Sequence, residues 1–155
     1  MSQVGIYLFG IPIPPSVNAQ YATIMRRGRP IRISSKEAKD YEKAFKVWQL
    51  SNRETLKTAR EDIVRWGKPL SISILVAFKR ERLVTKDGRL KKLDVSNRTK
   101  SLHDLLSAAL GIDDCLFVSC PIQKVVADTY DEQVVACIRP SELRGLSDID
   151  LQELR

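Results

Sequence analysis

Histidine and cysteine are scarce in this sequence. It contains one histidine, His103, and three cysteines, Cys115, Cys120 and Cys137, none of them in a C-x-x-C pair. Closed zinc sites use four Cys or His ligands, so this composition argues against one, and a Cys/His nucleophile pair would have to use His103. We expect the cysteines to be buried thiols in a reducing compartment.

The sequence also lacks a long apolar run, internal repeats and low-complexity tracts. Its N-terminal apolar segment is short, has no basic lead-in and is interrupted by Pro12, Pro14 and Pro15. This pattern predicts neither a signal peptide nor a membrane span. At 155 residues the chain has the length of about one domain. We therefore expect a soluble, cytoplasmic protein with one compact core.

Positive charge is plentiful and unevenly distributed. Lys and Arg number 26 against 19 Asp and Glu, which gives a net charge of +7 and a pI near 9.5. Polyanions are the partners that such a surface favours, although many basic proteins merely have a solvated positive surface. Seven basic and two acidic residues fall within Lys79–Lys92, with a turn expected at Asp87 and Gly88. If this segment projects, its cations can follow a phosphate backbone.

A second basic cluster lies between Met25 and Ile33. It holds four arginines around Gly28 and Pro30, within a region whose composition predicts a loop. A short flexible loop of this kind can reach phosphates, and a solvated turn is the alternative interpretation. Tyr21, beside the cluster, can stack on an unpaired base or simply pack against its neighbours.

Hydrophobic periodicity predicts an α/β fold. Alternating apolar residues indicate a first strand at 4–9, a strongly β-branched strand at 70–78, and two strands at 121–130 and 133–139 that would pair antiparallel. A helix should start near Ser35, weaken at 51–52 and stop at Gly67, and another should follow Ser96 as N-cap. We predict a single domain with a mixed sheet of about four strands, packed with two or three helices.

Carboxylates stand at both ends of the helix that is expected after Ser96. Asp94 precedes it, Asp113 and Asp114 follow it, and Lys100 lies within it. Mg²⁺ takes oxygen ligands and needs only one or two protein carboxylates with substrate phosphate oxygens, so the pattern favours a metal site acting on phosphate. The alternatives are a helix-dipole role for Asp94, solvent-facing acids, and a surface ion pair between Lys100 and Asp104.

These motifs together resemble the RusA family of Holliday-junction resolvases. The similarity covers Val4 to Arg139 and leaves the tail outside it. The residues that carry it are Asp94, Asn97 and Lys100 in LDVSNRTK, Asp104 in SLHDLL, the IDD of Ile112 to Asp114 before an apolar strand, and IPIPPSVN at Ile11–Asn18.

The resemblance implies a homodimeric α/β endonuclease that uses Mg²⁺ or Mn²⁺ to cut four-way DNA junctions by paired incisions in recombination and repair. It implies a nuclease domain at 1–140 and a tail at 141–155, for which a short helix after Ser147 is expected. Asp94 and Asp114 match its metal-binding aspartates and Lys100 its essential lysine, with Asp113 as a further metal ligand. The family's motif usually carries a second acid two residues after the first, where this chain has Ser96.

Serine brings no charge, so a cation is held more weakly unless Asp113 or Asp104 compensates. A junction-binding protein with weakened or lost catalysis is therefore an alternative, as is a less specific nuclease. The side chains expected to contact DNA are Arg26, Arg27, Arg29, Arg32, Lys79, Arg80, Arg82, Lys91, Lys92 and Asn97.

Overall fold

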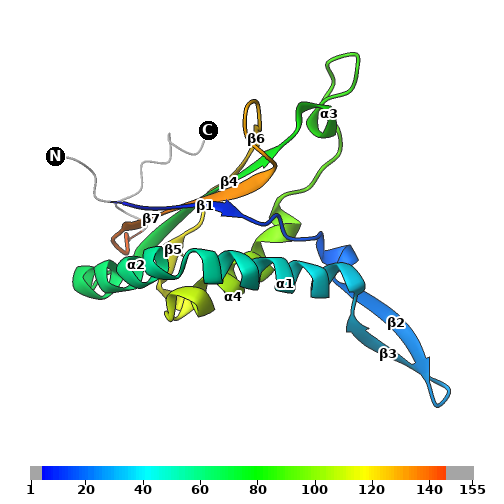
Figure 1. Ribbon diagram of the computed structural model, residues 1–155, viewed down its shortest axis with the longest axis horizontal. Helices are drawn as coiled ribbons and strands as arrows, with labels where there is room; N and C mark the ends of the chain where they lie inside the picture. The colour runs from blue at the N-terminus through cyan, green and yellow to red at the C-terminus, as the bar shows by residue number, and fades with distance from the viewer. Residues whose placement is uncertain (1–4, 146–155) are drawn as a thin grey trace.

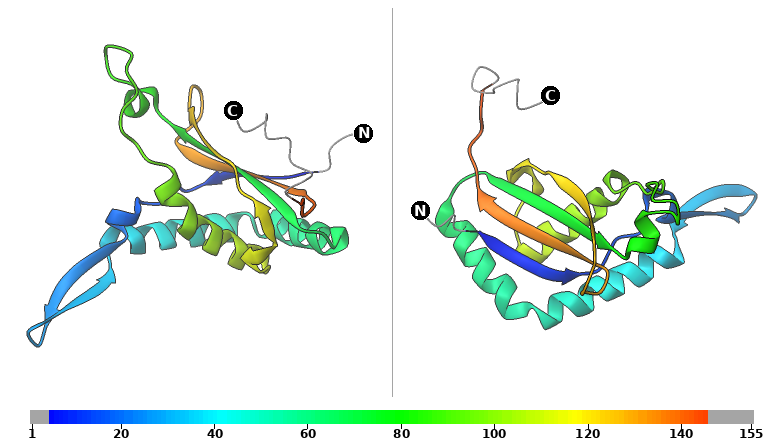
Figure 2. Two further views of the ribbon diagram at one scale, coloured as in Figure 1. Left: turned by 180° about the vertical axis from the view of Figure 1, so that it is seen from behind. Right: turned by 90° about the horizontal axis from the view of Figure 1, so that it is seen from above.

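One mixed β-sheet carries three main helices on one face. The computed structural model describes residues 5–145, and Figures 1 and 2 show the helices together on the same side of the sheet. The sheet has five strands in the order β1-β7-β4, with β5 and β6 both pairing with the remaining edge of β4. Their bounds are β1 Ile6–Ile11, β4 Leu70–Phe78, β5 Phe117–Ser119, β6 Ile122–Val126 and β7 Gln133–Pro140.

Strand β4 lies at the centre because its sequence, LSISILVAF, alternates apolar residues with smaller or polar ones. Every second residue from Leu70 to Phe78 is at most 1% exposed and belongs to the core. β4 pairs antiparallel with β7 on one edge and parallel with β5 and β6 on the other. The predicted α/β class with a mixed sheet is therefore confirmed.

Helices α1 (Lys36–Ser51) and α2 (Arg53–Trp66) form the predicted interrupted helical region. The Ser35 hydroxyl caps α1 by accepting a hydrogen bond from the N–H of Ala38 at 3.0 Å. The break falls at Asn52, whose side-chain amide donates to the carbonyl of Trp48 at 2.8 Å. Trp48 is itself buried, and its indole N–H donates to the carbonyl of Phe9 at 2.8 Å, which ties α1 to β1.

Helix α4 (Thr99–Leu110) follows a short 3-10 helix, η2 (Ser96–Arg98). Its buried side chains, Leu102, Leu106 and Leu110, are each at most 1% exposed and pack into the core. The helix ends at Gly111, whose φ of 64° is the left-handed conformation that glycine adopts at low cost. A second 3-10 helix, η3 (Asp114–Leu116), then leads into β5.

The prediction of a loop around the four arginines between Met25 and Ile33 is wrong. This region forms a two-stranded hairpin, β2 (Tyr21–Arg26) and β3 (Arg29–Ser34), that projects from the body of the molecule (Figure 1). Arg27 and Gly28 make the turn with φ of 50° and 74°, and positive φ at both turn residues suits the twist of a tight hairpin. Asn-Gly is the usual signal for such a turn, and Arg-Gly lacks the side chain that makes it recognisable.

The predicted pairing of the last two strands is also wrong. β6 pairs parallel with β4, from Ile74 with Ile122 to Phe78 with Val126, while β7 occupies the opposite edge of β4. Adjacent strands usually pair, but here the central strand lies between them, so the sheet gains a fifth strand.

The segment 79–92 projects from the body of the molecule (Figure 1), with a short helix α3 (Arg80–Leu83) and a bridge between Val84 and Leu90. Cys115 and Cys120 are exposed and Cys137 is partly buried, so the expectation of buried thiols is wrong for the first two. None of the helices within residues 5–145 combines the length and apolarity needed to cross a membrane. The helix predicted after Ser147 lies outside the described residues.

Replacing Leu106 by alanine should reduce the free energy of unfolding by about 2–5 kcal/mol, because it leaves a cavity where α4 packs into the core. Urea denaturation measures this change. Leu143→Ala is the matched control, since Leu143 is 81% exposed and should leave stability almost unchanged. Equal effects of the two substitutions would contradict the placement of α4.

Candidate functional site

Asp94 lies just before η2, and the donors of its own loop orient its carboxylate. Oδ1 accepts hydrogen bonds from the N–H and hydroxyl of Ser96 at 2.9 and 2.6 Å and from the N–H of Asn97 at 3.4 Å. Oδ2 accepts one, from the side-chain amide of Asn97 at 2.7 Å. The carboxylate is exposed, so it can meet a ligand from solvent while its orientation is held.

The same contacts keep Asp94 ionised. The hydroxyl of Ser96 is the main cause that lowers the pKa of Asp94, and the backbone N–H groups of Asn97 and Ser96 and the charge of Lys124 act in the same direction. The predicted N-cap role of Ser96 is wrong: no side chain caps α4, and the serine hydroxyl donates to Asp94 instead. Asn97, predicted to contact DNA, also uses its amide on Asp94.

Two basic residues that sequence reasoning missed hold this loop. The ammonium of Lys124, on β6, donates to the carbonyl of Leu93 at 3.0 Å, and the guanidinium of Arg98 donates to the carbonyl of Pro14 at 2.6 Å. Lys124 is the only charged residue within the strand IQKVV, and that isolated charge was the available signal. The loop that carries Asp94 is thus attached to the sheet on one side and to the proline-rich segment on the other.

Lys100 lies in the first turn of α4, at the same end of the helix as Asp94. Its side chain is exposed, and within residues 5–145 no hydrogen bond or ion pair engages its ammonium. The surface ion pair between Lys100 and Asp104, considered as an alternative from the sequence, is therefore not formed. Lys100 is a cation available to a substrate.

Asp113 and Asp114 lie beyond the opposite end of α4. Asp113 caps η3 by accepting a hydrogen bond from the N–H of Cys115 at 3.0 Å, and this N–H is the main cause that lowers the pKa of Asp113. Asp114 is exposed, and its charge acts on His103 in the second turn of α4, opposing the effect of burial, which lowers the pKa of that imidazole.

A helix of 12 residues, about 18 Å long, therefore separates Asp94 from the aspartate pair along the chain. Among the described residues, no group of three or more His, Cys, Asp or Glu side chains is placed to hold a metal ion. The predicted set of Asp94, Asp113 and Asp114 is thus not gathered into one closed cluster within a single chain.

The predicted DNA-contacting cations lie on two projections. Figures 1 and 2 show the β2–β3 hairpin and the 79–92 segment extending from the end of the molecule at which α4 begins. Arg26, Arg27 and Arg29 lie at the hairpin tip, where they are exposed. Arg82 differs, because its guanidinium forms an ion pair with Glu132 at 2.8 Å and covers the ring of Phe78.

A sequence model of the family described as endodeoxyribonuclease RusA matches residues 12–136, which include both basic projections, the Asp94 loop, α4 and the aspartate pair. The chain belongs to the RusA family. No curated protein sequence matches it. The match to the family model confirms the resemblance that was inferred from LDVSNRTK and IDD. It also confirms that the chain belongs to a family of endodeoxyribonucleases.

Replacing Ser96 by alanine should raise the pKa of Asp94, because the hydrogen bond that most lowers it is lost. The carboxylate then takes up its proton at a higher pH on acidification, so any metal binding through Asp94 should also be lost at a higher pH. A carbon-13 NMR titration of the aspartate carboxyl groups measures the shift. Ser119→Ala, on exposed β5, is the control, and an unchanged Asp94 titration in Ser96→Ala would refute the assignment.

Proposed function

We propose that this RusA-family chain is a divalent-metal-dependent endonuclease that resolves four-way DNA junctions by phosphodiester hydrolysis in recombination and repair. The observation that carries the proposal is the presence, at the start of α4, of an oriented carboxylate, Asp94, and of an exposed ammonium, Lys100, that no hydrogen bond or ion pair engages within residues 5–145. Figure 1 shows that the two basic projections extend from the end of the molecule at which α4 begins. A carboxylate that holds a metal ion and a cation that stabilises developing negative charge are both means of catalysing phosphodiester hydrolysis.

The donor chemistry at Asp94 fits Mg²⁺ or Mn²⁺. Oδ1 already accepts three hydrogen bonds, whereas Oδ2 accepts one, which leaves Oδ2 a lone pair for a hard cation. Asp94 would hold the ion together with water and substrate phosphate oxygens. The resemblance to the RusA family implies Asp114 as the second carboxylate, although it lies beyond the opposite end of α4 and makes no contact with Asp94 within residues 5–145. A bound divalent ion polarises the phosphate and lowers the pKa of the attacking water.

The protein's own residues supply orientation and charge. Asn97 and Ser96 hold the Asp94 carboxylate in one direction through side-chain hydrogen bonds. Lys100, a compact cation on the first turn of α4, would stabilise negative charge on the phosphoryl oxygens or on the leaving oxygen. This division of roles leaves Lys124 and Arg98 to position the loop rather than to touch substrate.

Two copies of the chain would suit the proposed substrate. A four-way junction has approximate two-fold symmetry, and a symmetric dimer presents two equivalent sites to it. In this proposal the arginines of the hairpin tip and the lysines of the 79–92 projection neutralise backbone phosphates on the arms, which makes binding steeply salt-dependent.

Ser96 supports a second candidate function, a junction-binding protein with little or no catalysis. The serine occupies the position at which the family usually has an acid, and its hydroxyl donates to Asp94 rather than adding negative charge. A cation would be held with one carboxylate fewer, while the basic projections remain available for DNA. Both candidate functions predict binding of four-way junctions, and only the first predicts that the junctions are cut.

Replacing Asp94 by asparagine should reduce cutting of a synthetic four-way junction by about 100-fold or more with Mg²⁺ or Mn²⁺ present, because the carboxylate proposed to hold the ion is lost. Junction binding should remain or tighten, since a negative charge near phosphate is removed. Gel assays of cleavage and of binding measure the two effects.

Asp62→Asn, on α2 away from the loop, is the matched control and should cut at the parental rate. Asp114→Asn in the same assay tests the second carboxylate. If Asp94→Asn cuts at the rate of the unsubstituted chain, the catalytic assignment of Asp94 is wrong. If Asp114→Asn cuts at that rate, only the role proposed for Asp114 is wrong.

Replacing Ser96 by aspartate should tighten divalent-ion binding. The Ser96 hydroxyl lies 2.6 Å from Oδ1 of Asp94, so a carboxylate at this position adds a like charge whose repulsion a cation relieves. Calorimetric titration with Mn²⁺ measures the affinity, and Ser96→Asn controls for size without charge. A rise in junction cutting by Ser96→Asp alone would show that the missing acid limits catalysis. Unchanged affinity would disprove a metal at Asp94.

A further inference from the structure

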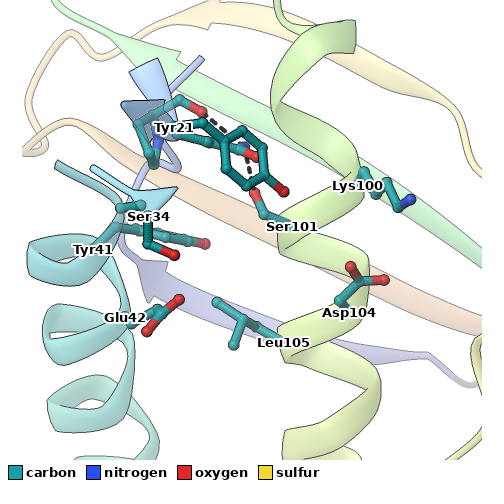
Figure 3. Close-up of a pocket in the computed structure, with 11 residues that line it drawn as sticks. Tyr21, Ser34, Tyr41, Glu42, Lys100, Ser101, Asp104 and Leu105 are labelled. Atoms are coloured by element: carbon teal, nitrogen blue, oxygen red, sulfur yellow. Dashed lines mark hydrogen bonds between the residues drawn. The ribbon is translucent and has the colours of Figure 1, made fainter. Parts of the chain in front are cut away.

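A pocket of about 410 Å³ opens between α1, α4 and the base of the β2–β3 hairpin (Figure 3). This volume lies within the usual range for small-molecule sites. Lys100 is part of its lining, so the pocket adjoins the proposed nuclease site. Its wall includes Gln20, Tyr21, Tyr41, Glu42, Ser101 and Asp104.

The hydroxyl of Tyr41 is a donor without a partner in this pocket. Tyr41 is 7% exposed, and its hydroxyl oxygen is buried with no hydrogen bond to any described residue. Figure 3 shows the hydroxyl directed into the space between α1 and α4. Burial raises the pKa of Tyr41, which keeps the hydroxyl protonated. An unpaired buried hydroxyl costs free energy, so a ligand acceptor at this point would remove that cost.

Two carboxylates on the pocket wall are free acceptors. Glu42 projects from α1 and Asp104 from α4, and neither forms a hydrogen bond or ion pair within residues 5–145. Their negative charge disfavours a phosphate inside the pocket and favours a group that carries N–H donors. The pocket thus combines a buried O–H donor with acceptors for an amino group.

Tyr21 supplies a flat surface at the pocket entrance. Its side chain is 47% exposed, and the guanidinium of Arg32 lies 3.9 Å from the ring centroid over one face. An unpaired base can stack on the other face of such an aromatic ring. Behind it, the side-chain amide of Gln20 donates to the hydroxyl of Ser101 at 3.2 Å, which joins the hairpin base to α4.

We propose that this pocket holds one unstacked DNA base of the cytosine or adenine type, from a nucleotide beside the phosphate that Lys100 contacts. The inference rests on the proposed function. Cytosine and adenine both place an exocyclic amino donor next to a ring-nitrogen acceptor. The amino group donates to Glu42 or Asp104, the ring nitrogen accepts from Tyr41, and the ring stacks on Tyr21. At the corresponding Watson–Crick positions thymine and guanine reverse this order, with a carbonyl acceptor next to a ring N–H donor.

Photocrosslinking tests the placement of the base without cleavage. Four-way junctions carrying 5-iododeoxycytidine at one position at a time around the crossover are irradiated with the full-length chain in the absence of divalent ions. Mass spectrometry should locate a crosslink to Tyr21 from one position, and Tyr21→Ala should abolish it. If no position of the junction gives a crosslink to a residue of the pocket, the proposal is overturned.

Base preference and stability test the recognition. Tyr41→Phe and the double variant Glu42→Ala with Asp104→Ala should each reduce the preference for cytosine over thymine at the crosslinked position by about threefold to tenfold, the range expected for one hydrogen bond. Tyr41→Phe should also raise the melting temperature, because it removes an unpaired buried hydroxyl. Glu61→Gln on α2 is the control. Unchanged preference in both variants contradicts the proposal.

Cutting of the same junctions with Mg²⁺ separates the two claims. If the chain crosslinks through Tyr21 and prefers cytosine but does not cut, the proposal of the base pocket stands and the proposal of a nuclease is wrong. If the chain cuts junctions but shows neither this crosslink nor this preference, the proposal of a nuclease stands and the proposal of the base pocket is wrong.

Discussion

The pairing of β4 on both edges is the constraint on which the rest of the structure depends. β7 pairs antiparallel with one edge, β5 and β6 pair parallel with the other, and the helix-facing side chains of the strand are almost fully buried. Because α4 packs its leucines into the same core, its first turn lies at a fixed place relative to the sheet. Lys124 on β6 then holds the Asp94 loop through Leu93.

Asp94 shows how much of a site a short loop can build alone. Four hydrogen bonds from Ser96 and Asn97 orient the carboxylate and keep it ionised. Ser96 replaces the charge expected at its position by a hydroxyl that serves Asp94, so the loop remains well ordered while its negative charge is smaller. Stability of the loop and affinity for a cation are therefore separate properties at this position.

The surroundings of this loop arise from segments far apart in sequence. The hairpin brings Tyr21, with Arg32 over its ring, to the pocket beside α4, and α1 adds Tyr41 and Glu42 from the other side. A buried hydroxyl without a partner is costly, and Tyr41 lines the same pocket as Lys100, so the proposed base pocket adjoins the proposed site of hydrolysis. In these proposals α4 contributes both to base recognition, through Asp104, and to the chemistry, through Lys100.

The sequence by itself determined the family, the α/β class, the start of α1 near Ser35, the helical break at Asn52 and the strand β4, because short-range periodicity and capping encode these features. Tertiary structure decided the rest. The partner of a strand depends on which strand edges of the sheet remain unpaired as the core forms. The position of β6 beside β4 therefore could not be predicted from the residues of β6 and its neighbours in sequence. The unpaired hydroxyl of Tyr41 likewise depends on packing between distant segments.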